Sequence, residues 1–130
     1  MEDLNIEELM RETNKHISYT NLTKKNPDFQ VDYVLKIDKE IEDIIPYQGM
    51  RCDFRYKNEN ISYMIYPEIL DKNGQIINSR DEEMNSEGKA FMWIFGDKDL
   101  HKNKLLLGTE GYWVVGSYTL AEVVITHVFF

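Results

Sequence analysis

The chain has 130 residues, a length typical of one domain, and its 42% hydrophobic and 12% aromatic residues favour a packed core over disorder. Its net charge of −8, from 23 acidic and 15 basic side chains, disfavours direct contact with nucleic acid or a membrane surface, because anionic phosphates attract clustered Lys and Arg. The same charge favours a basic protein partner. A single cysteine allows no internal disulfide, and the sequence shows neither a signal-peptide pattern nor an apolar run of about 20 residues, so we expect a cytoplasmic protein.

The first 27 residues are expected to form a short helix followed by a polar linker. Residues 4–16 predict the helix, since Asn5 can cap it and Glu8 stands where a capping box needs an acid. "SYTNLTKKNPD", residues 18–28, has no apolar period and is interpreted as a linker. The remaining residues, 28–130, are expected to form a single β-barrel domain.

From residue 28 onward the apolar residues recur with a period of two, which predicts strands with one buried face. The predicted strands span residues 29–37, 50–56, 61–70, 89–95, 111–115 and 118–130. Tight turns at 71–74 and 116–117 indicate antiparallel hairpins. We therefore predict a mainly β fold, an antiparallel closed barrel of about six strands or more behind a short N-terminal helix, with the terminal "HVFF" ending in the core.

The stretch "PYQGMRCDFRY" holds the only cysteine and separates into two faces. Cys52 falls on the apolar face and is predicted to be buried and inert, because no histidine lies close in sequence to activate its thiol. Arg51, Asp53 and Arg55 fall on the other face. They are the residues of an enzyme alternative with a scattered site, although such a strand face is more often a ladder of surface ion pairs.

No motif in the sequence predicts a catalytic centre, a cofactor or a metal site. His16, His101 and His127 lack the spacing of a zinc helix, and there is no CxxC pair. "DKNGQIINSRDEE" lacks the alternating acids and the central glycine of a calcium loop. A phosphate-binding glycine loop and a nucleophile elbow are also missing from the sequence.

One family pattern runs through residues 28–130. It consists of an alternating strand, a Gly-apolar-Arg-x-x-Phe element, a loop that ends in glycine before a strong strand, and a closing hairpin. Gly49, Met50, Arg51 and Phe54 form the second element, and Gly88 ends the loop. The residues of the closing hairpin that match the pattern are Gly116, Thr119, Leu120, Ala121 and Val123. In these features the chain resembles the third domain of elongation factor Tu, as a small bacterial protein that stands alone. The resemblance implies a closed six-stranded barrel with a binding role, and no GTP chemistry because the GTPase domain is absent.

The first hypothesis for function is a non-enzymatic acidic protein-binding module. Its most concrete form is an immunity or inhibitor protein that neutralises a basic bacterial toxin such as a nuclease. The predicted partner-binding residues are Asp81, Glu82, Glu83 and Glu87, followed by Glu40, Glu42 and Asp43. The possible aromatic anchors are Tyr47, Trp93, Tyr112 and Trp113. The alternatives are a translation-associated accessory protein, as the resemblance implies, and an enzyme with an unrecognised site.

Overall fold

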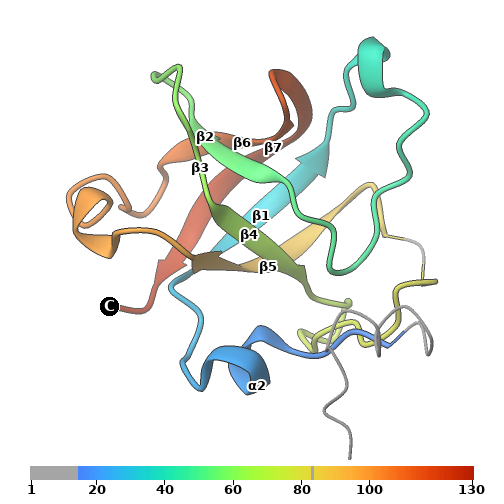
Figure 1. Ribbon diagram of the computed structural model, residues 1–130, viewed down its shortest axis with the longest axis horizontal. Coiled ribbons are helices and arrows are strands. Elements are labelled where there is room, and N and C mark those ends of the chain that lie inside the picture. Colours follow the sequence, from blue (N-terminus) through green and yellow to red (C-terminus); the bar gives the residue numbers. More distant parts are fainter. Residues whose placement is uncertain (1–14, 83) are drawn as a thin grey trace, which may run out of the picture.

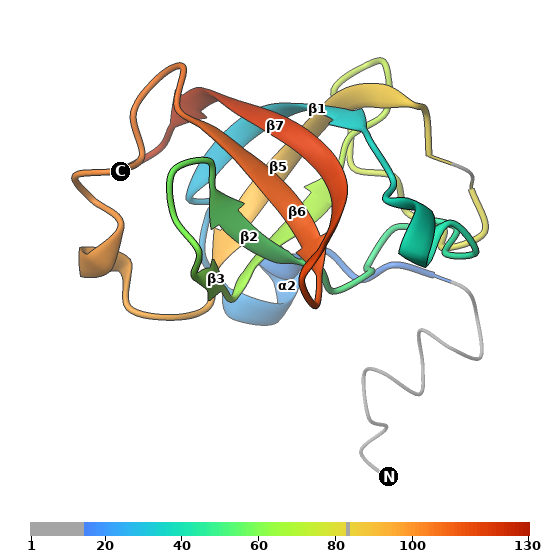
Figure 2. The same ribbon diagram turned by 90° about the horizontal axis from the view of Figure 1, so that it is seen from above.

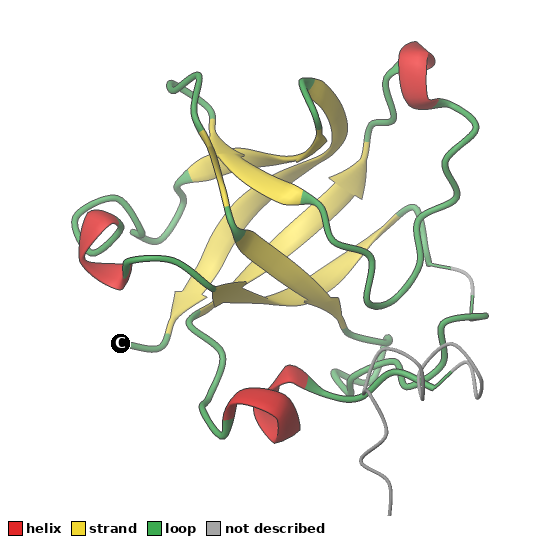
Figure 3. Cartoon of the chain, in the orientation of Figure 1, coloured by secondary structure: helices red, strands yellow, loops and turns green. Residues whose placement is uncertain are grey.

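The computed structural model describes residues 15–82 and 84–130, which form a mainly β structure (Figures 1 and 3). The strands are β1 Phe29–Leu35, β2 Asp53–Tyr56, β3 Ser62–Tyr63, β4 Ile65–Ile69, β5 Glu87–Ile94, β6 Glu110–Val115 and β7 Tyr118–Val128. One short α-helix, α2 Tyr19–Thr23, and two 3-10 turns, η1 Lys39–Ile41 and η2 Lys98–Leu100, complete the described elements. No helix within these residues is long and apolar enough to cross a bilayer.

All seven described strands belong to one antiparallel sheet with the order β3-β2-β6-β7-β1-β5-β4. Its two edge strands, β3 and β4, are consecutive in the chain and are separated only by Met64. The sheet therefore curls strongly, and Figure 2 shows it as a half-barrel seen from above. The mainly β, antiparallel prediction is confirmed. Closure of the barrel is not confirmed, because no pairing between the two edge strands β3 and β4 is found among the described residues.

Alternation along the strands places one face of the curled sheet in the core. In β2 the buried residues Phe54 and Tyr56 alternate with Asp53 and Arg55, and Cys52 immediately before the strand is also buried, as predicted. The fully buried side chains come from most of the sheet and include Phe29, Val31, Tyr33, Phe54, Ile65, Met92, Trp113, Leu120 and Ile125. Such burial of apolar surface is the main favourable term in the folding of a domain of this size.

A close approach between two strands requires glycine at position 111. A Cβ there would lie 2.5 Å from Cζ of Phe54 and 2.9 Å from the carbonyl oxygen of Arg55. The predicted turn at 71–74 is present, with the N–H of Gly74 donating to the carbonyl of Asp71 at 3.0 Å and Gly74 at a φ of +80°.

The structure departs from the sequence predictions in the N-terminal segment and at the C-terminal end of β7. The helix expected over residues 4–16 lies outside the described residues except at its last two positions, where the chain is not helical and Lys15 pairs with Ser79 in a β-bridge. The predicted linker contains α2, which the hydroxyl of Ser18 caps by accepting from the N–H of Thr20. The prediction that "HVFF" ends in the core is wrong for its last two residues, because β7 stops at Val128 and both phenylalanines are about half exposed.

Candidate functional site

The two acidic loops predicted from the sequence lie at the same end of the sheet. Because the strands are antiparallel, β1 ends where β5 begins, and the N–H of Leu35 donates to the carbonyl of Ser86 at 2.8 Å. In Figures 1 and 2 the segment around η1 and the loop leading into β5 occupy the same side of the molecule. Ile41 and Met84, one from each loop, both pack against the core. The fold thus brings together two segments that are distant in sequence.

We call this region the acidic end and define it by its exposed carboxylates, which are Glu40, Glu42, Asp43, Asp81, Glu82 and Glu87. Glu83, which was predicted with them, lies outside the described residues. In the described part of the chain these carboxylates form no ion pair, whereas Asp28, Asp32 and Asp99 each bind a lysine. Lys39 and Arg80 lie in the same two loops but are outnumbered by acids. The negative potential of this end is therefore only partly neutralised within the chain.

Exposed apolar side chains lie next to these carboxylates. Ile45 is 74% exposed, Tyr118 is 41% exposed and Tyr47 is 37% exposed. The guanidinium of Arg80 stacks over the ring of Tyr47 at 5.0 Å from its centroid, which links the two loops. Large apolar side chains surrounded by charged groups are the composition of a protein-binding surface.

The four predicted aromatic anchors differ in how exposed they are. Tyr47 is exposed, but Trp93 and Trp113 are 3% and 1% exposed and belong to the interior, so neither is available to a partner. Tyr112 is half-buried on the outer face of β6, where Arg55 of β2 stacks on its ring at 4.9 Å. Tyr118 was not predicted as an anchor, since the alternation along β7 gives no sign that its first residue is exposed beside the turn at 116–117.

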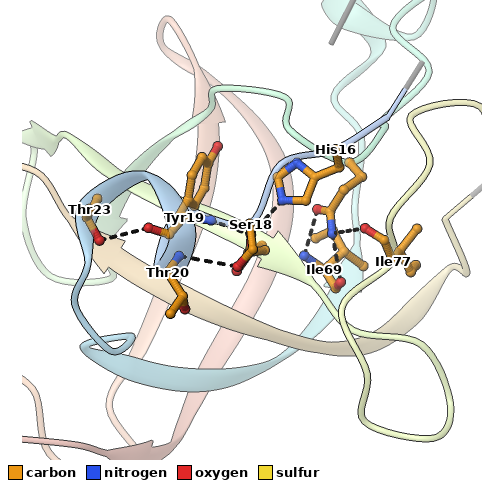
Figure 4. Close-up of polar contacts among 9 residues, drawn as sticks. His16, Ser18, Tyr19, Thr20, Thr23, Ile69 and Ile77 are labelled. Carbon is orange, nitrogen blue, oxygen red and sulfur yellow. Dashed lines mark hydrogen bonds and ion pairs between the residues drawn. The ribbon is translucent and has the colours of Figure 1, made fainter. Parts of the chain in front are cut away.

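A buried ionisable pair holds the N-terminal segment against β4. Nε2 of His16 lies 2.5 Å from Oε2 of Glu68, and the backbone N–H of Tyr19 donates to the same oxygen at 2.9 Å. Figure 4 shows this segment running alongside the sheet, with His16 and Tyr19 pointing toward it. Glu68 is fully buried. Burial of the Tyr19 hydroxyl, and after it the proximity of Glu68, raises the pKa of Tyr19 to about 12.

The side-chain amide of Gln48 forms a second buried connection beside this pair. It donates to the carbonyls of Ile69 at 2.9 Å and Ile77 at 2.8 Å, and it accepts from the N–H of Ile69 at 2.8 Å (Figure 4). The loop before β2 is thereby fixed to the end of β4. Glu68 and His16 together form a carboxylate–imidazole pair of the kind that performs general-base chemistry. Because both side chains are buried, a substrate in solvent cannot reach them, and their role here is structural.

The second buried histidine, His101, stabilises the loop that contains η2. Its Nδ1 lies 2.7 Å from the hydroxyl of Tyr56, and its ring packs edge-on against Tyr63. Burial, assisted by the charge of Lys104, lowers the pKa of His101, which favours the neutral ring in this contact with the hydroxyl of Tyr56. His127 lies on the exposed end of β7, so the described histidines occupy three separate places. No cluster of three metal-ligating side chains occurs among residues 15–82 and 84–130.

The three residues of the enzyme alternative, Arg51, Asp53 and Arg55, are exposed or half-buried in the structure. Arg51 is exposed, and Arg55 is engaged with Tyr112 on the outer face of the sheet. Cys52 is 2% exposed, and burial raises the pKa of its thiol to about 12, which keeps it protonated and unreactive at neutral pH. Comparison of the chain with protein-family models and with curated proteins finds no match to either.

Proposed function

We propose that the protein is a non-enzymatic binding module whose acidic end captures a basic protein. The observation that carries this proposal is the position of two acidic loops at one end of a small curled sheet, with exposed Ile45, Tyr47 and Tyr118 beside them. The most concrete form is an immunity or inhibitor protein that occupies the basic, nucleic-acid-binding cleft of a bacterial toxin such as a nuclease.

The charge distribution supports this form of the proposal. Five carboxylates elsewhere in the described structure are paired with lysines, as in Lys57–Glu110 at 2.6 Å and Lys89–Asp32 at 2.7 Å. Those at the acidic end remain available to an external cation. Unpaired charges at the rim of an interface accelerate association and make it sensitive to salt. A toxin cleft that binds nucleic acid carries clustered Lys and Arg, which is the complementary surface.

The scaffold that we propose is a closed barrel, as the resemblance to elongation factor Tu implies. Two observations support closure: β3 and β4 are separated only by Met64, and β2 lies next to β4 as well as next to β3. A closed barrel exposes no strand edge, so the partner would be bound by loop side chains and not by an added strand. We place the protein in the cytoplasm, a reducing compartment in which the thiol of Cys52 remains free.

A salt-graded capture experiment tests the proposal. Wild-type chain and the charge-reversal variant Asp81→Lys/Glu82→Lys/Glu87→Lys are immobilised, exposed to native cell lysate, and washed at low and then at high salt before mass spectrometry. The proposal predicts a basic protein that wild type retains at low salt and releases at high salt. Each exposed charge pair contributes roughly 0.5–1 kcal/mol, so the variant should bind about 10–100-fold more weakly.

Charge reversal away from the acidic end provides the control. Asp99→Lys/Glu122→Lys alters two exposed carboxylates on other surfaces and should leave the captured protein unchanged. Equal loss of binding in both variants would show only a general charge effect and would contradict the assignment of the acidic end. Capture of ribosomal proteins or elongation factors in place of a basic toxin would favour the translation-associated alternative and reject the inhibitor form.

A further inference from the structure

A pocket lies between the segment that follows α2 and the chain that leaves β5. The N–H of Asp28 donates to the carbonyl of Met92 at 3.0 Å, and the N–H of Ile94 donates to the carboxylate of Asp28 at 2.7 Å, so the two segments are fixed to each other. In Figure 1 they lie on the side of the molecule away from η1. The pocket has a volume of about 320 Å³, which falls within the usual range for small-molecule sites.

The side chains around the pocket offer hydrogen-bond donors that have no acceptor. Within the described part of the chain, the ammonium of Lys25 and the side-chain amide of Asn26 form no hydrogen bond or ion pair. Trp93 lines the same pocket and is 3% exposed, and its Nε1, which can only donate, has no acceptor among residues 15–82 and 84–130. Lys98 contacts Asp28 at 2.7 Å, and because an ammonium has three donors it can bind a second acceptor.

Apart from the amide oxygen of Asn26, the side-chain acceptors around the pocket are already engaged. The Asp28 carboxylate is buried and accepts from a backbone N–H and from a lysine ammonium. The hydroxyl of Thr23 donates to the carbonyl of Tyr19 at 2.7 Å and accepts from the N–H of Lys25 at 3.3 Å. A ligand that matches this pocket therefore supplies acceptor atoms and receives hydrogen bonds from the protein.

The charge around the pocket differs in sign from that of the whole chain, which is −8. Lys25 and Lys98 line the pocket, and Lys24 adjoins it. The nearby acids are Asp28, which Lys98 neutralises, and Asp97, whose carboxylate accepts a backbone N–H at the start of η2. Three lysines thus stand against two acids, and the acceptor atoms of a ligand are best carried by an anionic group.

An aromatic side chain forms an apolar part of the wall. Phe95 is 40% exposed, and its ring is held edge-on to Tyr19 at 5.7 Å and tilted against Tyr66 at 5.2 Å between ring centroids. The next residue, Gly96, has no atom within 4 Å of the position that a Cβ would take, so the wall is open beside this ring. A flat apolar group can pack on Phe95 from the pocket.

We propose that this pocket binds a small organic anion, a carboxylate or a phosphate ester attached to an apolar group. The anionic group accepts from Lys25, Lys98 and the indole N–H of Trp93, and the apolar group packs on Phe95. An indole N–H that is buried without an acceptor is unfavourable, so a ligand oxygen seated against it stabilises the complex. The pocket is separate from the acidic end, so this inference is independent of the proposed function.

Two-dimensional ¹H–¹⁵N NMR of the full chain tests the proposal, because the chain contains only two tryptophans and each gives one indole N–H signal. The probes are phenyl phosphate, benzoate, inorganic phosphate and neutral benzyl alcohol. Phenyl phosphate or benzoate should shift the signal of Trp93 saturably, with a dissociation constant on the order of 1 mM, and leave that of Trp113 unchanged. Inorganic phosphate lacks the apolar group and benzyl alcohol lacks the charge, so each should bind at least about 5-fold more weakly. The stronger of the two organic anions identifies the anionic group as phosphate or carboxylate.

Three variants locate the binding site. Lys25→Gln removes one cation and should raise the dissociation constant by about 2–5-fold. Gly96→Leu adds a side chain where the backbone has open space, so it should occupy part of the pocket and abolish saturable binding. The control Lys72→Gln removes an exposed lysine in the turn at 71–74, away from the pocket, and should bind like wild type.

Circular dichroism confirms that each variant is folded before the titrations are compared. The absence of a saturable shift of the Trp93 signal with both organic anions would overturn the proposal. Benzyl alcohol that binds as tightly as the anions would overturn the assignment of an anionic ligand. Binding that is unchanged in both Lys25→Gln and Gly96→Leu would place the ligand elsewhere and would also overturn it.

Discussion

The buried pair of His16 and Glu68 provides a quantitative test of how the N-terminal segment is held. Replacing Glu68 by Leu leaves the imidazole of His16 buried without its partner and removes the acceptor of the Tyr19 N–H. Replacing His16 by Leu leaves a buried carboxylate with one backbone donor. Breaking a buried pair by removing one member costs about 3–5 kcal/mol, and we expect each single variant to lose stability in this range.

The double variant His16→Leu/Glu68→Leu should recover most of this loss. An apolar pair of similar volume needs no charge compensation, so the remaining cost is that of the unpaired Tyr19 N–H, about 1–3 kcal/mol. The double-mutant cycle should therefore give a coupling energy of about 3 kcal/mol or more. This expectation separates a buried hydrogen-bonded pair from two side chains that each contribute packing alone.

Urea unfolding at neutral pH, followed by the fluorescence of the buried Trp93 and Trp113, measures the free energy of unfolding of the four proteins. The isosteric variant Glu68→Gln, which retains an acceptor for the Tyr19 N–H, should fall between wild type and Glu68→Leu. Single variants that each cost less than about 1 kcal/mol would refute the structural role assigned to the pair. A double variant whose cost equals the sum of the single costs would refute the coupling.

Three further predictions concern other buried positions. Burial lowers the pKa of His101 below 6.5, so as the pH falls the imidazole is protonated in the unfolded chain before it is protonated in the folded chain. The contribution of His101 to the free energy of unfolding should therefore be complete above pH 6.5 and decrease below it. Urea midpoints at about pH 7 and pH 5 measure this decrease, which should be smaller in His101→Gln. Cys52 should react with a thiol-specific disulfide reagent only on unfolding, and rapid labelling of native protein would contradict its burial. Gly111→Ala should destabilise by about 1–3 kcal/mol in urea because its methyl group meets Phe54, whereas Gly96→Ala, which has open space around it, should be nearly neutral; equal effects would contradict the close approach.

Most of the sheet could be predicted from the sequence because its strands alternate apolar and polar residues. In β2 the alternation predicted correctly that Cys52, Phe54 and Tyr56 are buried. α2 could not be predicted in the same way, since five residues are too few to show a helical period and its stabilising contacts come from Ser18 and Glu68. A closed barrel remains a prediction, because strand alternation carries no information about how the two edges of a sheet meet.

The candidate site was only partly accessible to sequence reasoning. The acidic loops could be identified from composition, but their position at one end depends on the antiparallel pairing of β1 with β5. The connection between His16 and Glu68 spans 52 positions and leaves no local pattern. One signal was present, a single carboxylate within the apolar run "ISYMIYPEIL", since a charge in a buried strand requires a buried partner.

The central claim is that the acidic end binds a basic protein, and the most direct measurement is the low-salt capture of partners by wild type and by Asp81→Lys/Glu82→Lys/Glu87→Lys from the same lysate. The account predicts one basic protein that is retained by wild type, released by high salt and lost from the variant, with Asp99→Lys/Glu122→Lys behaving as wild type. Retention of the same proteins by all three chains, or the absence of any salt-sensitive basic protein, would contradict it.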